Sequence, residues 1–180
     1  AIYGAGRTFV AGADIKEFGK PSQAPFLPEL VNTIEQSSTP VISILHGTAL
    51  GGGLEIALGT HARVGIKGLR LGLPEIHLGL LPGAGGTQRT PRLVGIPAAL
   101  EMILSGRHVP AAEALELGLI DQLCEGEARD VAINAAKDVL AGRLKTRRTD
   151  QITVKPNHAF LDEVEAKLMA TQAHLFSPHK

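Results

Sequence analysis

The sequence predicts an α/β fold, and three observations lead to that prediction. Residues 41–45 form an apolar, β-branched run, which is typical of a strand buried on both faces of a sheet. A glycine-rich turn at 47–53 follows and leads directly into a helical pattern at 54–58. Later in the chain, residues 127–142 have the apolar spacing of an amphipathic helix. Strands that alternate with turns and helices in this way indicate the α/β class.

The composition limits the partners that such a domain can have. The chain has 180 residues, which is enough for a sizeable core, and Leu, Ile, Val and Ala must dominate that core because there are five Phe, one Tyr and no Trp. Lys plus Arg number 18, and so do Asp plus Glu, so the basic excess of most nucleic-acid-binding proteins is missing. No apolar run approaches the ~18 residues of a membrane span. We therefore expect neither nucleic acid nor a membrane as a partner.

The first part of the chain predicts short elements separated by turns. Residues 1–10 have the pattern of a strand, a turn and the end of a second strand. Small residues at 11–15 indicate a turn, and the prolines within 19–28 predict a loop. The apolar spacing at 30–34 predicts a short helix.

The middle of the chain continues the alternation of strands and helices. Residues 62–66 and 69–73 predict two further short strands. A Gly/Pro-rich loop is expected at 74–87, and helical stretches are expected at 88–94 and 97–105.

The last part of the chain predicts helices with one strand between them. A helix starts at Pro110, a residue favoured in a first helical turn, and Gly118 ends it. Residues 120–123 are a strand candidate, and the polar run 143–150 indicates a solvated linker. A final helix carries one apolar stripe, formed by Phe160, Val164, Leu168, Met169 and Phe176.

The first candidate for chemistry is the glycine run 51–53, with Glu55 just behind it. Three glycines let the backbone approach a ligand closely, and the free N–H groups at a helix N-terminus favour a developing negative charge. From this segment alone, a tight turn that needs glycine only for steric reasons is an equally good interpretation. Glu55 also has a second interpretation, because the helix dipole favours acidic residues in a first turn.

The second candidate is Glu75, which follows Pro74 between apolar residues and precedes the glycine-rich cluster 81–86. Apolar surroundings of this kind raise the pKa of a carboxyl toward a value useful in acid–base catalysis. Taken alone, a solvent-facing loop glutamate is the favoured interpretation. The small-residue turn 11–15 is a third and weaker candidate, because it can offer a backbone N–H to a ligand.

Several familiar catalytic and binding motifs are absent from the sequence. There is no GxxxxGK[ST] phosphate loop and no GxSxG elbow of a serine hydrolase. The cluster 83–86 does not follow a clear strand, so it is a poor dinucleotide fingerprint. The seven His residues are scattered without the spacing of a zinc site, and we expect no metal.

Taken together and in this order, four segments resemble the crotonase (enoyl-CoA hydratase/isomerase) superfamily. They are Ala11-Gly-Ala-Asp-Ile-Lys16, Gly47-Thr-Ala-Leu-Gly-Gly-Gly-Leu-Glu55, Gly72-Leu-Pro-Glu-Ile76 and Leu80-Leu-Pro-Gly-Ala-Gly-Gly-Thr-Gln88. The resemblance runs from about residue 1 to about residue 125, and the ordered set of four is highly specific. It implies a crotonase-type spiral of repeated ββα units with a helical C-terminal segment.

The resemblance also implies a mechanism and assigns roles to residues. The backbone N–H groups of Ala13 and Gly52 would form an oxyanion hole for a thioester carbonyl. Glu55 and Glu75 would hold one water and deliver its parts to C3 and C2 of an enoyl group, with Gly83 framing that water. The matching segments imply further substrate contacts at Ala11, Gly12, Asp14, Ile15 and Lys16.

Because both glutamates are present, the resemblance favours an enoyl-CoA hydratase. Such an enzyme adds water reversibly to trans-2-enoyl-CoA and gives 3-hydroxyacyl-CoA in fatty-acid β-oxidation, with Δ3–Δ2 isomerisation as a second activity. No cofactor is expected, since the acyl-CoA thioester itself makes the chemistry feasible. Two alternatives stay open: an isomerase without useful hydratase activity, and a non-catalytic module that binds RNA. Segments 79–83 and 96–100 look most like the hydratase part of bifunctional β-oxidation enzymes.

The resemblance divides the chain into a crotonase core at 1–125 and a helical C-terminal segment at 126–180. The family's fold begins with about one more strand–helix–strand block, so we expect a block with basic residues for the CoA phosphates to precede Ala1. As partners we expect the acyl-CoA substrate and either a homo-oligomer or an attached 3-hydroxyacyl-CoA dehydrogenase domain. The expected location is cytoplasmic in a bacterium and otherwise the mitochondrial or peroxisomal matrix.

Overall fold

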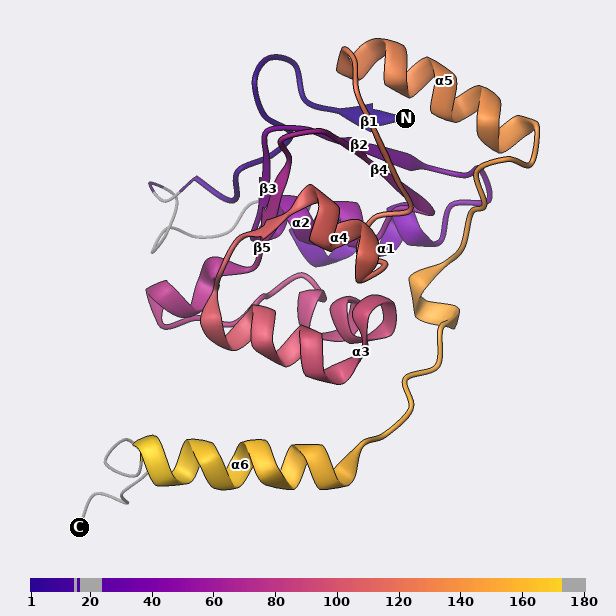
Figure 1. Cartoon of the computed structure of the whole chain (residues 1–180). Helices are drawn as coiled ribbons and strands as arrows, with labels where there is room; N and C mark the ends of the chain where they lie inside the picture. Colours follow the sequence, from indigo (N-terminus) through magenta and orange to yellow (C-terminus); the bar gives the residue numbers. More distant parts are fainter. Residues whose placement is uncertain (15, 17–23, 173–180) are drawn as a thin grey trace.

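A four-stranded parallel sheet forms the centre of the molecule (Figure 1). The structure is a computed structural model that describes residues 1–14, 16 and 24–172. The neighbouring strands of the sheet are, in order, β1 (Ile2–Tyr3), β2 (Ile42–Leu45), β4 (Ala62–Ile66) and β7 (Gln122–Cys124). The α/β class and the central strand predicted at 41–45 are confirmed.

A smaller sheet stands beside the first one and corrects one prediction. It consists of β3 (Thr48–Leu50), which pairs in parallel with β5 (Arg70–Gly72), and of β6 (Val109–Pro110), which pairs antiparallel with β5. The turn predicted over residues 47–53 is therefore wrong in its first half, where residues 48–50 form strand β3. Gly47 has φ 61° and separates β2 from β3, and the three residues after it become a strand only through their pairing with β5. A strand this short shows no alternation in the sequence.

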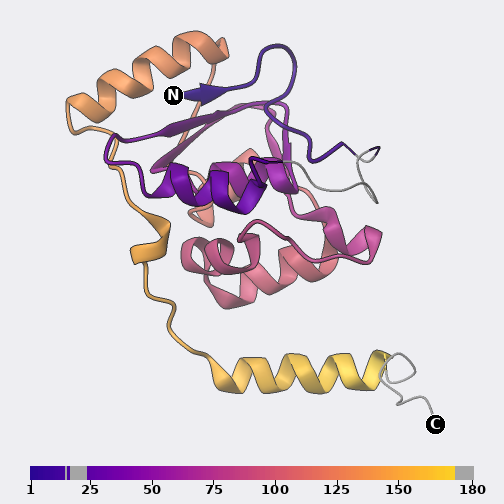
Figure 2. The ribbon, with the colours of Figure 1, turned by 180° about the vertical axis from the view of Figure 1, so that it is seen from behind.

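Helices cover both faces of the central sheet (Figures 1 and 2). Helix α5 (Ala128–Leu140) lies on one face, and α1 (Leu27–Glu35), α2 (Gly52–Leu58) and α4 (Ala111–Glu116) lie on the other. Helix α3 (Gly86–Ser105) adds a further layer against α2. All four residues of β2 are buried, as the sequence predicts for a strand covered on both faces.

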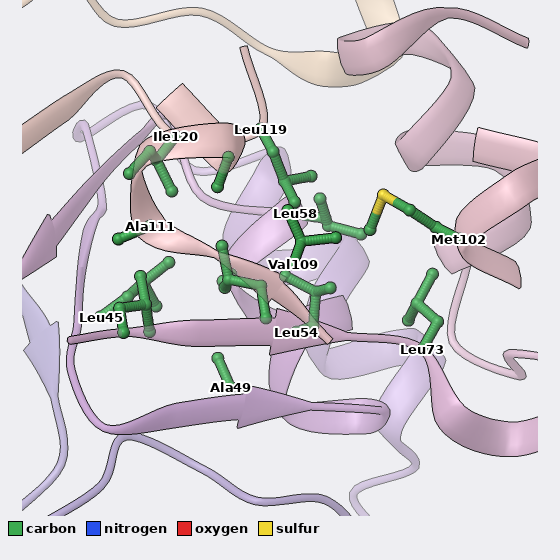
Figure 3. Packing of buried hydrophobic residues seen from close by; sticks show 14 of the residues in the cluster. Leu45, Ala49, Leu54, Leu58, Leu73, Met102, Val109, Ala111, Leu119 and Ile120 are labelled. Carbon is green, nitrogen blue, oxygen red and sulfur yellow. The ribbon is translucent and has the colours of Figure 1, made fainter. Parts of the chain in front are cut away.

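Alternate residues of the central strands divide between two cores. Ile42 and Ile44 pack with Val64 and with Val131 of α5. The opposite face holds the larger core, and Figure 3 labels ten of its members: Leu45, Ala49, Leu54, Leu58, Leu73, Met102, Val109, Ala111, Leu119 and Ile120. Burying one such Leu stabilises the fold by roughly 1.5–3 kcal/mol. Because this core includes residues of α2 and the residue before Pro74, it anchors the two elements that carry the candidate glutamates.

Several element boundaries differ from the predicted ones. Helix α1 begins at Leu27, so the predicted loop 19–28 is wrong at its end, because Pro28 is tolerated in a first helical turn. The predicted loop 74–87 contains a 3₁₀ helix, η2 (Pro74–Leu78). The two helical stretches predicted on either side of residue 95 are confirmed within α3, where Gly95 at φ 80° breaks the helical backbone.

The solvated linker predicted at 143–150 is confirmed for its exposed residues, which include Arg143, Lys145 and Arg147, but the segment is not solvated throughout. Leu144 and Thr149 are buried, and the Thr149 hydroxyl donates to the carbonyl of Leu58 at 3.0 Å. The short 3₁₀ helix η3 (Thr149–Gln151) follows, and the Asp150 N–H donates to Oε1 of Glu35 at 3.0 Å. The polar composition of this segment does not predict these contacts, because they join residues far apart in the sequence.

The last helix, α6 (His158–Gln172), is reached by an extended segment and lies beyond α3 (Figure 1). It confirms the predicted final helix. Its apolar residues Phe160, Val164 and Leu168 line a cavity of about 350 Å³ together with Leu100 and Leu104 of α3. The stripe residue at 176 lies outside the described residues. No helix in the described part of the chain is long and apolar enough to cross a membrane.

Candidate active site

The N-terminus of α2 is an uncapped helix end formed by glycines. Gly51 has φ 52°, and its N–H donates to the carbonyl of Gly72 at 2.9 Å. No side chain caps α2, and the first N–H groups of any helix have no intrahelical acceptor. A Cβ on Gly53 would lie 2.2 Å from the carbonyl oxygen of Val10, so glycine is required there. The N–H of Gly52 therefore lies at a helix end that the backbone at Val10 and at Gly72 approaches closely.

The segment after Val10 runs along this helix end. Val10 forms a parallel bridge with Ala49, and its carbonyl accepts the N–H of Leu50 at 3.1 Å. Gly12, at φ 119°, would place a Cβ 3.6 Å from the carbonyl oxygen of Leu50. Ala13 follows directly, so the two predicted oxyanion donors come from adjacent segments. Convergence of their N–H groups on one oxygen stays a prediction.

The other described residues of the predicted substrate-binding segment are exposed. They include Ala11, Asp14 and Lys16, and the N–H of Lys16 donates to Oδ1 of Asp14 at 3.0 Å. Ile15 lies outside the described residues. The substrate contacts of this segment stay predictions.

Glu55 is buried in the first part of α2, with 2% of its surface exposed. Its Oε1 atom accepts the N–H groups of Ala84 at 2.6 Å and of Gly86 at 2.7 Å. Hydrogen bonds from backbone N–H groups to a carboxylate are among the stronger ones in proteins. A Cβ on Gly86 would lie 3.0 Å from this same oxygen, which explains the glycine. The attraction between the helix dipole and an acidic residue in the first turn does not explain these two hydrogen bonds.

Glu75 stands on η2 in a different environment. It is half-buried, which corrects its interpretation as a solvent-facing loop residue, and its Oε2 atom is buried without a hydrogen-bond partner. Burial raises the pKa of Glu75, and the nearby charge of Glu55 raises it further, although a backbone hydrogen bond within Glu75 itself opposes the shift. The expectation that apolar surroundings raise this pKa is confirmed in direction.

The two glutamates lie close enough for one charge to affect the other. A Cβ on Gly51 would lie 3.1 Å from Oε1 of Glu75, so the Glu75 carboxylate rests against the N-terminus of α2, the helix that carries Glu55. Gly83 precedes the Ala84 N–H that holds Glu55, and a Cβ there would meet nothing within 4 Å. Its role in framing a water stays a prediction. Together these residues place two carboxylates beside free backbone N–H groups.

The sequence patterns did not identify Arg89, which lies behind the Ala84–Gly86 loop. Arg89 forms a buried ion pair with Glu35, and its guanidinium also donates to the carbonyl of Ala84 at 3.1 Å. The paired residues are 54 positions apart, and no local pattern predicts such a contact. Within the described residues, no group of three or more His, Cys, Asp or Glu is arranged to hold a metal ion.

The chain matches the model of the enoyl-CoA hydratase/isomerase family over residues 1–177. It is 48% identical over 172 residues to a peroxisomal bifunctional enzyme of Danio rerio, which covers 95% of this chain and 24% of the relative. A probable enoyl-CoA hydratase of Bacillus subtilis is 46% identical over 147 residues, which covers 78% of this chain and 56% of the relative. The expected similarity to bifunctional enzymes is therefore confirmed.

Solved structures give the same result for the fold. An enoyl-CoA hydratase from Bacillus anthracis superimposes with a TM-score of 0.71 at 37% identity, over 77% of this chain and 57% of that one. The DspI protein of Pseudomonas aeruginosa gives 0.69 at 32% identity, over 93% of this chain and 74% of that one. The chain spans 24% of the bifunctional relative and 56% of the Bacillus subtilis relative. These likenesses confirm the predicted crotonase-type architecture, and the chain belongs to the enoyl-CoA hydratase/isomerase family.

Proposed function

We propose that this chain catalyses the reversible hydration of trans-2-enoyl-CoA, with Glu55 and Glu75 acting on one water. The proposal rests on one observation: the two neighbouring carboxylates have different surroundings. Two backbone N–H groups fix Glu55, whereas Glu75 has a raised pKa and a buried oxygen without a partner. Water addition needs one oriented base and one group that donates a proton, and we assign these roles to Glu55 and Glu75.

The hydration step can be written so that all atoms balance. Glu55 accepts a proton from the water as the water oxygen bonds to C3. The C2–C3 π electrons move toward the thioester oxygen, and the resulting enolate takes a proton at C2 from Glu75. Transfer of the proton from Glu55 to Glu75 restores the starting pair, so that one water has been added. Because the carboxylates are coupled, the titration of the site belongs to the pair.

Stabilisation of the enolate is the role we propose for the N–H groups of Ala13 and Gly52. The uncapped end of α2 and the position of Gly12 beside Leu50 support this assignment. Loss of one oxyanion donor typically lowers the rate on the order of 10²–10³-fold. The thioester carbonyl accepts the developing charge, so the proposed step requires no redox or metal cofactor.

The same site supports Δ3–Δ2 isomerisation as a second activity. That reaction moves a proton between C4 and C2 of an enoyl thioester and uses the same enolate. One acid–base group is sufficient for it, and the raised pKa of Glu75 makes this residue the better candidate.

The wider context of the reaction is also part of the proposal. We propose acyl-CoA as the substrate and an attached domain, a 3-hydroxyacyl-CoA dehydrogenase, that consumes the product. The word bifunctional in the names of relatives, together with the 24% of the Danio rerio enzyme that this chain covers, supports the second domain. Those names also support a peroxisomal location, and the Bacillus subtilis relative supports the cytoplasmic alternative.

The proposal is tested by assaying the full chain with trans-2-enoyl-CoAs of several lengths. Hydration removes the conjugated double bond, so the absorbance of the enoyl thioester falls as the reaction proceeds. We expect turnover with at least one chain length, and a 3-enoyl-CoA in the same assay measures isomerisation. Isomerisation without hydration contradicts the proposal, and so does salt-dependent binding of RNA without any turnover.

A further inference from the structure

The loop that holds Glu55 is itself held from the other side. Ala84 and Gly86 direct their N–H groups to Oε1 of Glu55 at 2.6 and 2.7 Å. The carbonyl of Ala84 accepts a hydrogen bond from Nη1 of Arg89 at 3.1 Å. The same short stretch of backbone therefore connects a candidate catalytic carboxylate to a guanidinium that lies outside the candidate site.

The other donors of Arg89 are bound to helix α1. Its Nη2 donates to Oδ1 of Asn32 at 2.8 Å and to Oε2 of Glu35 at 2.6 Å, and its Nε donates to the same Glu35 oxygen at 3.1 Å. Oε1 of Glu35 accepts the N–H of Asp150 at 3.0 Å. Arg89 is 7% exposed and Glu35 is 4% exposed, so their ion pair is largely shielded from solvent. The guanidinium is thus fixed in one position.

The loop backbone is shaped to fit this guanidinium. Gly85 has φ 95°, and a Cβ at this position would lie 2.0 Å from Nη1 of Arg89. Only glycine allows the backbone to pass this close to the charged group. The glycine therefore serves the contact between the loop and Arg89, in addition to allowing the turn.

We propose that Arg89 is a positioning residue that orients the Glu55 carboxylate through the Ala84–Gly86 loop. The inference rests on the proposed function, in which Glu55 acts on the substrate water. Arg89 contacts Ala84, Asn32 and Glu35, so its effect on the reaction passes through the loop backbone. If the loop relaxes, Glu55 loses its two donors and meets the water at the wrong distance. A misplacement of about 1 Å can lower a rate about 10²-fold.

The planar fork of arginine explains why lysine cannot replace it. Arg89 reaches the carbonyl of Ala84 and the side chains of Asn32 and Glu35 from three different nitrogens. Lysine keeps the charge that neutralises Glu35, but its single ammonium cannot occupy all three donor positions. Arg89→Lys therefore preserves the ion pair while releasing the loop.

The test compares Arg89→Lys with Arg143→Lys, which changes an exposed arginine paired with Asp138 on the surface. For Arg89→Lys we expect kcat for enoyl-CoA hydration to fall about 10- to 100-fold with KM within about twofold of wild type. Amide hydrogen exchange of Ala84 and Gly86, measured by NMR, should become at least about tenfold faster, because their acceptor is no longer fixed. Arg143→Lys should change neither quantity.

Two further outcomes separate this inference from the proposed function. Arg89→Lys with wild-type kcat and wild-type exchange at Ala84 and Gly86 overturns the inference. If wild type hydrates no enoyl-CoA, the proposed function fails, and the exchange rates alone decide whether Arg89 fixes the loop. If Arg89→Lys does not fold, Asn32→Ala removes one exposed acceptor of the guanidinium, and we expect kcat to fall about threefold. An unchanged kcat in that variant overturns the inference.

Discussion

The end of α2 and the turn of η2 each carry one glutamate, and they support it in opposite ways. At α2, Glu55 is buried and receives two backbone N–H groups on one oxygen. At η2, Glu75 is half-buried and leaves one buried oxygen without a partner. The first environment fixes the orientation of a carboxylate, and the second raises the pKa of a carboxyl. The same residue type thus acquires two properties from two local surroundings.

This difference explains how one site can contain both a base and an acid. Backbone N–H donors hold the Glu55 carboxylate in one orientation, whereas burial raises the pKa of Glu75 and so favours its protonated form. The proposed division, with Glu55 oriented and Glu75 as the proton donor to C2, follows from the comparison and can be tested by changing each side separately.

The largest effect is expected from Glu75→Gln, which removes the proton carrier and keeps the shape of the side chain. We expect hydration and isomerisation both to fall by about 10³-fold or more, toward the upper part of the range for general acid–base groups. Steady-state assays with a trans-2-enoyl-CoA and a 3-enoyl-CoA measure the two activities. Glu125→Gln, at an exposed surface pair with Lys67, is the matched control and should leave both unchanged. Activity of Glu75→Gln within a few-fold of wild type rules out the assigned role.

Glu55→Gln should separate the two activities. The glutamine oxygen can still accept from Ala84 and Gly86, so the fold should persist while the base is lost. We expect hydration to fall about 10²- to 10³-fold and isomerisation to stay within about tenfold of wild type. The same two substrates measure the ratio. Equal losses in both activities would show that the glutamates do not divide the work as proposed.

Gly51→Ala is expected to disturb the contact between the two regions. Its Cβ would lie 3.1 Å from Oε1 of Glu75, and residue 51 has φ 52°. We expect kcat to fall about tenfold, since the carboxylate must move by a few tenths of an ångström. Gly142→Ala provides the control, because residue 142 also has positive φ but a Cβ there meets nothing within 4 Å. Similar kcat values for Gly51→Ala and wild type would place Glu75 outside the reacting pair.

The smallest expected effect is a pH-dependent change in the Tm of Glu75→Gln relative to wild type. Burial raises the pKa of Glu75 in the folded chain above its unfolded value, so the stability linked to this carboxyl is full below the unfolded pKa and is lost as pH rises through the folded pKa. Glu75→Gln escapes this loss because it carries no charge. We expect its Tm to exceed that of wild type by about 1–2 °C at about pH 8, with a smaller difference at about pH 4. A calorimetric Tm advantage of wild type at the higher pH would contradict the raised pKa.

Local patterns in the sequence were sufficient for most of the fold, whereas the choice of the two glutamates came from the resemblance to the crotonase superfamily, because each glutamate taken alone also had a purely structural interpretation. Three features depend only on residues close together in the sequence: the strand run 41–45, the glycines before Glu55 and the amphipathic helix α5. The periodicity of apolar residues predicts such local features. The neighbours Leu73 and Ile76 indicated a raised pKa for Glu75, and the direction is confirmed, although a solvent-facing loop residue was the favoured interpretation of Glu75 taken alone. These features need no knowledge of how the chain folds back on itself.

Features that depend on distant pairing could not be predicted. Strand β3 exists through β5, and the support of Glu55 comes from Ala84 and Gly86, which follow it by 29 and 31 residues. The ion pair between Arg89 and Glu35 and the burial of Thr149 join segments even farther apart. The residues that perform the proposed chemistry were therefore visible in the sequence, whereas the residues that position them were not.

The central claim, that Glu55 and Glu75 share one water beside a common oxyanion hole, is tested most directly by a crystal structure with an unreactive saturated ligand, butanoyl-CoA. The account predicts that the thioester oxygen lies about 2.7–3.2 Å from the backbone nitrogens of both Ala13 and Gly52. It also predicts one water within the same range of both glutamate carboxylates, next to C3 of the acyl chain. A ligand bound with its carbonyl away from these nitrogens, or carboxylates that contact separate waters, would contradict the account.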